Sequence, residues 1–159
     1  MKILYIGGGF VGACSAAVSA DSGHDVLVYD VDKGKVEKLS TDDRDVIQSC
    51  LHEEGLAELL IRNRSRIIFT HDKKSLEKFA EEAEAVFMCL PTPEIGDTGE
   101  SNLSYYFDAA QLLAKSLTQR NDKSQNNHIV IINKSTVPID MVNTTQELMD
   151  NAGVQNYGV

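Results

Sequence analysis

The chain has 159 residues with a net charge of −9, and 42% of its residues are apolar. This length is enough for one domain with a sizeable core and too short for two full ones. The acidic balance argues against nucleic acid as a partner, and no apolar stretch reaches the roughly 18 residues of a membrane span.

Strand and helix patterns alternate along the first half of the chain. The apolar run 2–6 predicts a buried strand. Residues 10–21 predict a helix, because small and apolar side chains recur there at helical spacing: Val11, Cys14, Ala17 and Val18. The pattern then predicts a strand over 25–30, a helix over 33–39, a polar loop over 40–49, a helix over 53–63 and a strand over 66–70.

The second half continues this alternation. Residues 72–84 predict a helix capped by Asp72, with Leu76 and Phe79 facing the core. Residues 85–90 are fully apolar and predict a central strand, whereas 91–102 contain two prolines and two glycines and exclude regular structure. A helix over 103–117, a polar loop over 118–127, a strand over 128–133 and a helix over 141–150 follow.

This alternation predicts an α/β fold with a doubly wound parallel sheet and helices on both faces. Such a sheet binds its ligand at the carboxyl ends of the strands, where the strand order reverses. We therefore expect the functional residues in the loops that follow the first, second, fourth and fifth strands.

Three glycines follow the first strand in a G-x-G-x-x-G pattern, at Gly7, Gly9 and Gly12. The first permits a tight turn, the second lets the backbone approach a pyrophosphate, and the third lets helix and strand pack closely, as in Rossmann-type folds. Asp30 lies 23 residues after Gly7, where a carboxylate accepts hydrogen bonds from ribose hydroxyls. Since no arginine follows Asp30 directly, the pattern favours NAD over NADP. The alternatives are a secretory signal peptide, which three successive glycines would weaken, and a purely structural turn.

The remaining composition points to a reducing compartment and to no metal site. Three cysteines, Cys14, Cys50 and Cys89, form no C-x-x-C pair, so we expect no disulfide framework. We expect a cytoplasmic location, because that compartment is reducing. The four histidines show no metal-ligand spacing.

Four further stretches resemble the UDP-glucose/GDP-mannose dehydrogenase family at its N-terminal NAD-binding domain. "HEEGLAELL" (52–60) is similar to that family's E-P-G-L segment, and "FTHD" (69–72) to its F-T-T-D. "LPTPEIGDTGESNLSYY" (90–106) resembles V-P-T-P…D-G…D-L-S-Y, and "NKSTVPID" (133–140) resembles K-S-T-V-P-V-G. The sequence departs from the family pattern at Glu54, Asn102 and Asp140, which bears on local turn geometry.

The resemblance implies a role for each matching residue. The turn 7–12, including Phe10 and Val11, would hold the pyrophosphate, Asp30 the ribose, and Lys35 would contact the adenosine side. The residues expected to border the rest of the cofactor are Leu90, Pro91, Thr92, Pro93, Glu94, Ser135, Thr136 and Val137. Thr136 resembles a catalytic threonine that positions the hydrolytic water. The alternatives are structural: prolines that stiffen a loop, a threonine that caps a turn, and solvated lysines at 35 and 134.

The resemblance also implies a reaction and a larger parent protein. The family oxidises the C6 hydroxyl of a nucleotide sugar to a carboxylate with two NAD, through a thiohemiacetal and a thioester on a cysteine. That cysteine has no match here, and neither the central helix nor the sugar-nucleotide-binding domain is present. We therefore expect residues 1–159 to be an NAD-binding domain that is inactive alone, with a homodimeric parent.

Three alternatives to this function stay open. UDP-glucose is the favoured substrate, with UDP-N-acetylmannosamine and GDP-mannose as the others. A second possibility is a hydroxyacid or hydroxyacyl-CoA dehydrogenase, and a third is a non-catalytic NAD-sensing module.

Overall fold

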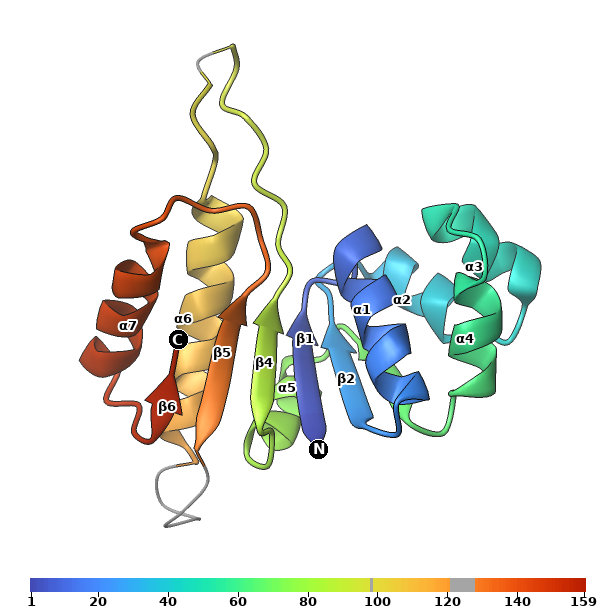
Figure 1. Ribbon diagram of the computed structural model, residues 1–159, viewed down its shortest axis with the longest axis horizontal. Helices are drawn as coiled ribbons and strands as arrows, with labels where there is room; N and C mark the ends of the chain where they lie inside the picture. The colour runs from blue at the N-terminus through green and yellow to red at the C-terminus, as the bar shows by residue number, and fades with distance from the viewer. Residues whose placement is uncertain (98, 121–127) are drawn as a thin grey trace.

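A six-stranded parallel sheet forms the centre of the protein, in the order β3-β2-β1-β4-β5-β6 (Figure 1). The computed structural model describes residues 1–97, 99–120 and 128–159. The strands are β1 (Lys2–Ile6), β2 (Asp25–Tyr29), β3 (Ile67–Thr70), β4 (Ala85–Met88), β5 (Ile129–Asn133) and β6 (Tyr157–Gly158). The strand order reverses between β1 and β4, so the predicted doubly wound sheet is confirmed.

Helices cover both faces of this sheet, as predicted (Figure 1). The helices are α1 (Phe10–Asp21), α2 (Lys33–Ser40), α3 (Arg44–Leu51), α4 (Leu56–Arg62), α5 (Lys73–Ala80), α6 (Ser104–Thr118) and α7 (Met141–Asn151). One buried cluster lies beneath α1 to α4, and a second lies beneath α5 to α7. Among the described residues, no helix is both long and apolar enough to cross a membrane.

The central strands are buried on both faces, which explains their apolar sequences. On β1, Leu4 and Ile6 face one core cluster, while Ile3 and Tyr5 face the other. Ile6 pairs with Tyr29 of β2 and with Met88 of β4, so these three strands end at the same level. The loops that follow them therefore start side by side.

Helix α1 packs on the sheet through alanines rather than through its valines. Its side chains at Ala13, Ala16 and Ala17 are fully buried, whereas Val11 and Val18 are 45% and 57% exposed. The valines recur at helical spacing, but they do not form the sheet-facing side of the helix. Small side chains there let α1 lie close to β1, which the glycine turn also requires.

Two elements differ from the sequence-based prediction. The predicted loop 40–49 contains most of α3, which begins after Asp43; that carboxylate accepts hydrogen bonds from the Asp45 and Val46 amides, and Ile47 is fully buried. The two-residue strand β6 was not predicted. The polar loop predicted over 118–127 lies mostly outside the described residues.

The segment between β4 and α6 is irregular, as its prolines and glycines predict. It projects from the carboxyl end of the sheet as a narrow arm (Figure 1). The Ile95 amide donates to the Glu100 carbonyl and the Asn102 amide to the Pro93 carbonyl, both at 2.7 Å. These two hydrogen bonds join the two sides of the arm, so its paired part begins at Pro93.

Candidate functional site

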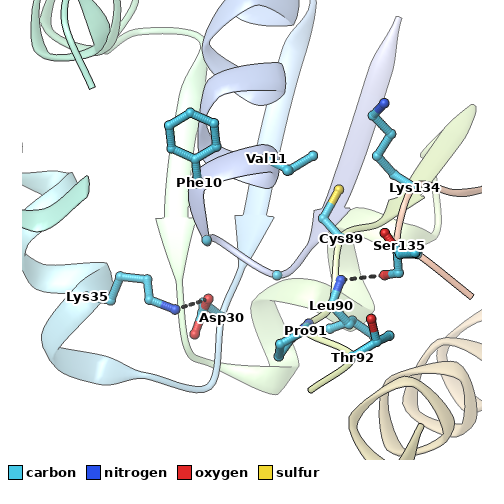
Figure 2. A pocket seen from close by; sticks show the side chains of 13 residues that line it. Phe10, Val11, Asp30, Lys35, Cys89, Leu90, Pro91, Thr92, Lys134 and Ser135 are labelled. Carbon is cyan, nitrogen blue, oxygen red and sulfur yellow. Dashed lines mark hydrogen bonds and ion pairs between the residues drawn. The ribbon is translucent and has the colours of Figure 1, made fainter. Parts of the chain in front are cut away.

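A crevice of about 400 Å³ lies at the carboxyl ends of β1, β2, β4 and β5, where the strand order reverses (Figure 2). Its walls come from the glycine turn, the end of β2, the start of α2 and the loops after β4 and β5. The residues that line it are Gly7, Gly9, Phe10, Val11, Asp30, Lys35, Cys89, Leu90, Pro91, Thr92, Lys134, Ser135 and Thr136. This is the edge of the sheet at which the sequence predicts ligand binding.

Gly7 and Gly12 must be glycine because neighbouring backbone leaves no space for a side chain. Gly7 has φ +104°, and a Cβ there would lie 2.1 Å from the Cys89 carbonyl oxygen. A Cβ on Gly12 would lie 1.9 Å from the carbonyl oxygen of Gly7. Both glycines therefore let three backbone segments approach more closely than any side chain allows.

Gly9 has a different reason to be glycine. Its φ of −71° is open to any residue, and no described atom outside its neighbours lies within 4 Å of a Cβ built there. Gly9 precedes α1, whose N-terminus has no side-chain cap and no acidic residue in its first turn. Its amides and dipole are thus directed at open space, as an anion such as a pyrophosphate needs. The turn therefore fits the diphosphate of a dinucleotide.

Asp30 is 7% exposed and already holds the surrounding backbone. Its Oδ2 accepts from the Lys35 ammonium at 2.8 Å (Figure 2) and from the Gly8 amide at 2.7 Å, and its Oδ1 accepts from the Asp32 amide at 2.9 Å. A carboxylate has about four acceptor positions. One ribose hydroxyl can therefore be accepted without rearrangement, whereas a second needs the position of Lys35.

The opposite wall is held by the hydroxyl of Ser135. This hydroxyl accepts from the Leu90 amide at 2.7 Å (Figure 2) and donates to the Met88 carbonyl at 3.1 Å. The Lys134 and Ser135 amides donate to the same carbonyl, at 3.0 Å each. Ser135 therefore joins the loops after β4 and β5, a role that its position in the sequence alone does not reveal.

We expect Ser135→Ala to weaken this wall. The substitution leaves the Leu90 amide without its acceptor, so the free energy of unfolding should fall by about 1 kcal/mol and NAD affinity about threefold. Urea unfolding and isothermal titration with NAD measure the two effects. Ser49→Ala, at an exposed position of α3, is the matched control, and equal behaviour of both variants would contradict the assignment.

Three further side chains line the crevice from the loops that follow β4 and β5. The Thr136 side chain is exposed, and the described part of the chain offers its hydroxyl no hydrogen-bond partner. Lys134 brings a cation to the rim. Burial raises the pKa of the Cys89 thiol to about 11, with Lys134 opposing, so this thiol stays protonated near neutral pH. Cys89 therefore lines the crevice as a protonated thiol.

The crevice brings together most, but not all, of the residues expected to touch the cofactor. Gly12 lies behind the turn, against Gly7, and Val137 packs on the core. Pro93 and Glu94 belong to the projecting arm, where Glu94 accepts from the Gly99 amide at 2.6 Å. Conversely, Cys89 and Lys134 line the crevice although neither was among the predicted cofactor contacts. In the described ranges, no group of three or more histidine, cysteine or acidic residues could hold a metal ion.

Comparisons with known proteins identify the family of this chain and agree with its fold. Residues 1–158 match the family model described as the UDP-glucose/GDP-mannose dehydrogenase family, NAD binding domain. A UDP-glucose 6-dehydrogenase of Rhizobium meliloti is 35% identical over 141 residues, which are 87% of this chain and 29% of that protein. UDP-glucose 6-dehydrogenase TuaD of Bacillus subtilis is 32% identical over 158 residues, 98% of this chain and 31% of that protein.

A solved structure agrees with this relationship. The ternary complex of GDP-mannose dehydrogenase from Pseudomonas aeruginosa superposes with a TM-score of 0.81 and 26% identity, over 100% of this chain and 35% of that one. The chain thus spans about a third of the length of the proteins that it matches. It belongs to the UDP-glucose/GDP-mannose dehydrogenase family, whose members are NAD-dependent nucleotide-sugar dehydrogenases, and it corresponds to that family's NAD-binding domain.

Proposed function

We propose that this chain is the coenzyme-binding part of a UDP-glucose 6-dehydrogenase, which oxidises UDP-glucose to UDP-glucuronate with reduction of two NAD. Gly9 carries the proposal: its missing side chain leaves a cradle that no part of the described protein fills, next to the uncapped start of α1. Several relatives named UDP-glucose 6-dehydrogenase, at 30–35% identity, support the choice of sugar.

Each wall of the crevice has its own task in this proposal. The amides at the start of α1 hold the pyrophosphate, and Asp30 accepts hydrogen bonds from the adenosine ribose. Bound NAD supplies the hydride acceptor at the nicotinamide end. There the Thr136 hydroxyl lines the crevice and has no hydrogen-bond partner among the described residues, so it can both donate to one group and accept from another. We assign Thr136 to positioning the water that releases the product.

The rest of the enzyme lies outside this chain in our proposal. A central helix and a sugar-nucleotide-binding domain would carry the catalytic cysteine, and the full-length protein would be a cytoplasmic homodimer. The cytoplasmic location in this proposal depends on the cysteine count and spacing in the sequence, which favour a reducing compartment. The similarity to GDP-mannose dehydrogenase makes that activity the second candidate.

Isothermal titration of the chain tests this proposal. NAD should bind with a Kd between about 1 µM and 1 mM, the range in which enzyme KM values usually fall. UDP-glucose should give no heat, and a mixture of both should form no NADH. Absence of NAD binding by a folded chain would overturn the proposal, and NADH formation by the chain alone would overturn the assignment of the catalytic groups to other domains.

A further inference from the structure

A buried phenol connects the two elements that flank Thr136. The segment 134–140, called the Thr136 segment below, follows Asn133 at the end of β5 and leads into α7 (Figure 1). The Tyr106 hydroxyl, from the first turn of α6, donates to Asn133 Oδ1 and is also hydrogen-bonded to the Thr145 hydroxyl of α7 at 2.7 Å. One side chain of α6 therefore contacts both the strand before the Thr136 segment and the helix after it.

This connection lies in an otherwise apolar core. Tyr106 and Thr145 are fully buried, and Tyr106 packs within the apolar cluster beneath α5 to α7. Burial raises the pKa of the Tyr106 phenol, while its bonds to Thr145 and Asn133 oppose that rise, so the phenol stays protonated and able to donate. A buried hydroxyl loses its hydrogen bonds to water and needs partners in the protein. Here both partners belong to the elements that flank the Thr136 segment.

Asn133 carries a polar group that stability alone does not explain. Its Nδ2 is buried and has no hydrogen-bond partner among the described residues. A buried donor without a partner destabilises a folded chain, so an apolar side chain of similar size, such as leucine, would suit the core better. The carboxamide oxygen, in contrast, is fixed by the Tyr106 hydroxyl. This arrangement fits a group that holds the end of β5 in one place.

The position of Thr136 depends on the backbone that carries it. The Thr136 side chain is exposed, and its hydroxyl has no hydrogen-bond partner in the described part of the chain. On one side of it, the Ser135 hydroxyl joins the Thr136 segment to the loop after β4. On the other side, the segment continues into α7, which Tyr106 holds through Thr145. Anchors on both sides therefore decide where the Thr136 hydroxyl lies.

We propose that Tyr106 is a positioning residue for Thr136: its phenol links the end of β5 to α7 and so fixes the Thr136 segment at the nicotinamide end of the crevice. The inference rests on the proposed dehydrogenase function, in which the Thr136 hydroxyl positions a water. Tyr106 is not among the described residues that line the crevice. It acts through the backbone of the segment and not by touching coenzyme or water.

Tyr106→Phe tests this role in the chain itself, because it keeps the buried ring and removes only the hydroxyl. We expect the NAD-induced shift of the Thr136 amide resonance to be lost and NAD affinity to fall about threefold, since the Thr136 segment loses its link to α6. Two-dimensional ¹H–¹⁵N NMR spectra with and without NAD measure the first effect, and isothermal titration measures the second.

Tyr157→Phe is the matched control. The Tyr157 hydroxyl also bonds to α7, at the Gln146 carbonyl (3.0 Å) and the Asp150 carboxylate (2.5 Å). These contacts lie further along α7 than Thr145 and involve no residue of β5. The Thr136 amide shift and the NAD affinity of this variant should therefore equal those of wild type.

A double variant separates positioning from stability. Adding Asn133→Leu to Tyr106→Phe replaces both polar partners by apolar groups of similar size, which can recover thermal stability. The link to the Thr136 segment stays broken, so the NAD-induced shift of the Thr136 amide should remain absent and the affinity about threefold low. Recovery of thermal stability together with the wild-type NAD response would overturn the proposal, because the polar pair would then serve only the core.

Thr145→Val keeps the test decisive if Tyr106→Phe does not fold, since it removes one bond of the phenol and leaves the ring in place. Folded Tyr106→Phe or Thr145→Val chains with the Thr136 amide shift and NAD affinity of wild type would overturn the positioning role. A folded wild-type chain that binds no NAD would instead overturn the function on which that role rests. Thermal unfolding of every variant confirms that it is folded before titration.

Discussion

Gly12→Ala is expected to lower the free energy of unfolding by about 3 kcal/mol or more and to weaken NAD binding at least tenfold. The new methyl group would lie 1.9 Å from the Gly7 carbonyl oxygen and 3.2 Å from Cys89 Cβ. Overpacking of a core side chain costs about 1–3 kcal/mol, and here the neighbour is backbone that cannot rotate away. Since α1 and the turn must separate, the diphosphate cradle is distorted too. Urea unfolding and NAD titration measure both losses.

Gly9→Ala separates binding from folding in the same turn. Its backbone conformation suits alanine and its methyl group meets no described atom within 4 Å, so the free energy of unfolding should stay within about 1 kcal/mol of wild type. The methyl group nevertheless enters the space of the diphosphate, and NAD affinity should fall at least tenfold. Full NAD affinity in Gly9→Ala would contradict the placement of the diphosphate, whereas a stable Gly12→Ala would contradict the packing argument.

The fold was predictable from the sequence where its signals are local and strong. The buried strands, the glycine turn and the Asp72 cap of α5 each depend on a few neighbouring residues, and all are confirmed. Helix α3 has a weaker signal: an acidic cap at Asp43 and only one fully buried side chain, Ile47. Its sequence resembles a loop, because the segment before it is polar and its other side chains are only partly buried or exposed.

Which side of α1 faces the sheet depends on the distance between the helix axis and the sheet. The periodicity of apolar residues does not indicate that distance. Hydrophobicity ranks valine above alanine, and the spacing of Val11 and Val18 is helical. The structure buries the alanines instead, because the Gly12 contact brings the helix axis too near the sheet for branched side chains. A glycine-rich turn followed by alanines at helical spacing is the signal that could have identified this side.

The site was predictable in its location and in most of its residues, but less so in what they do. Topology alone places the ends of β1, β2, β4 and β5 at one edge. It does not give the direction of a side chain. The hydroxyl of Ser135 bonds to Leu90 and Met88 rather than facing a ligand, and the ammonium of Lys35 contacts Asp30. Both roles depend on side-chain conformations that only packing between distant segments decides.

Asp30→Ala should weaken NAD binding by about 1–3 kcal/mol, that is by roughly ten- to a hundredfold, through the loss of charge-assisted bonds to the ribose. The structure adds a second effect. The buried Gly8 amide and the Asp32 amide lose their acceptor, and the Lys35 ammonium loses its partner. The free energy of unfolding should therefore fall as well, by about 1–3 kcal/mol for the orphaned buried amide. Thermal unfolding with and without NAD, together with titration, measures the two effects on one sample.

Asp30→Asn distinguishes the charge from the hydrogen bonds. The amide oxygen of asparagine still accepts from one backbone donor, so this variant should retain more stability than Asp30→Ala. Its affinity for NAD should nevertheless remain below that of wild type, because a neutral acceptor binds ribose hydroxyls more weakly than a carboxylate does. If both variants bind NAD as tightly as wild type, the ribose does not lie at Asp30, and the acidic residue at the end of β2 serves only to hold the glycine turn against the start of α2.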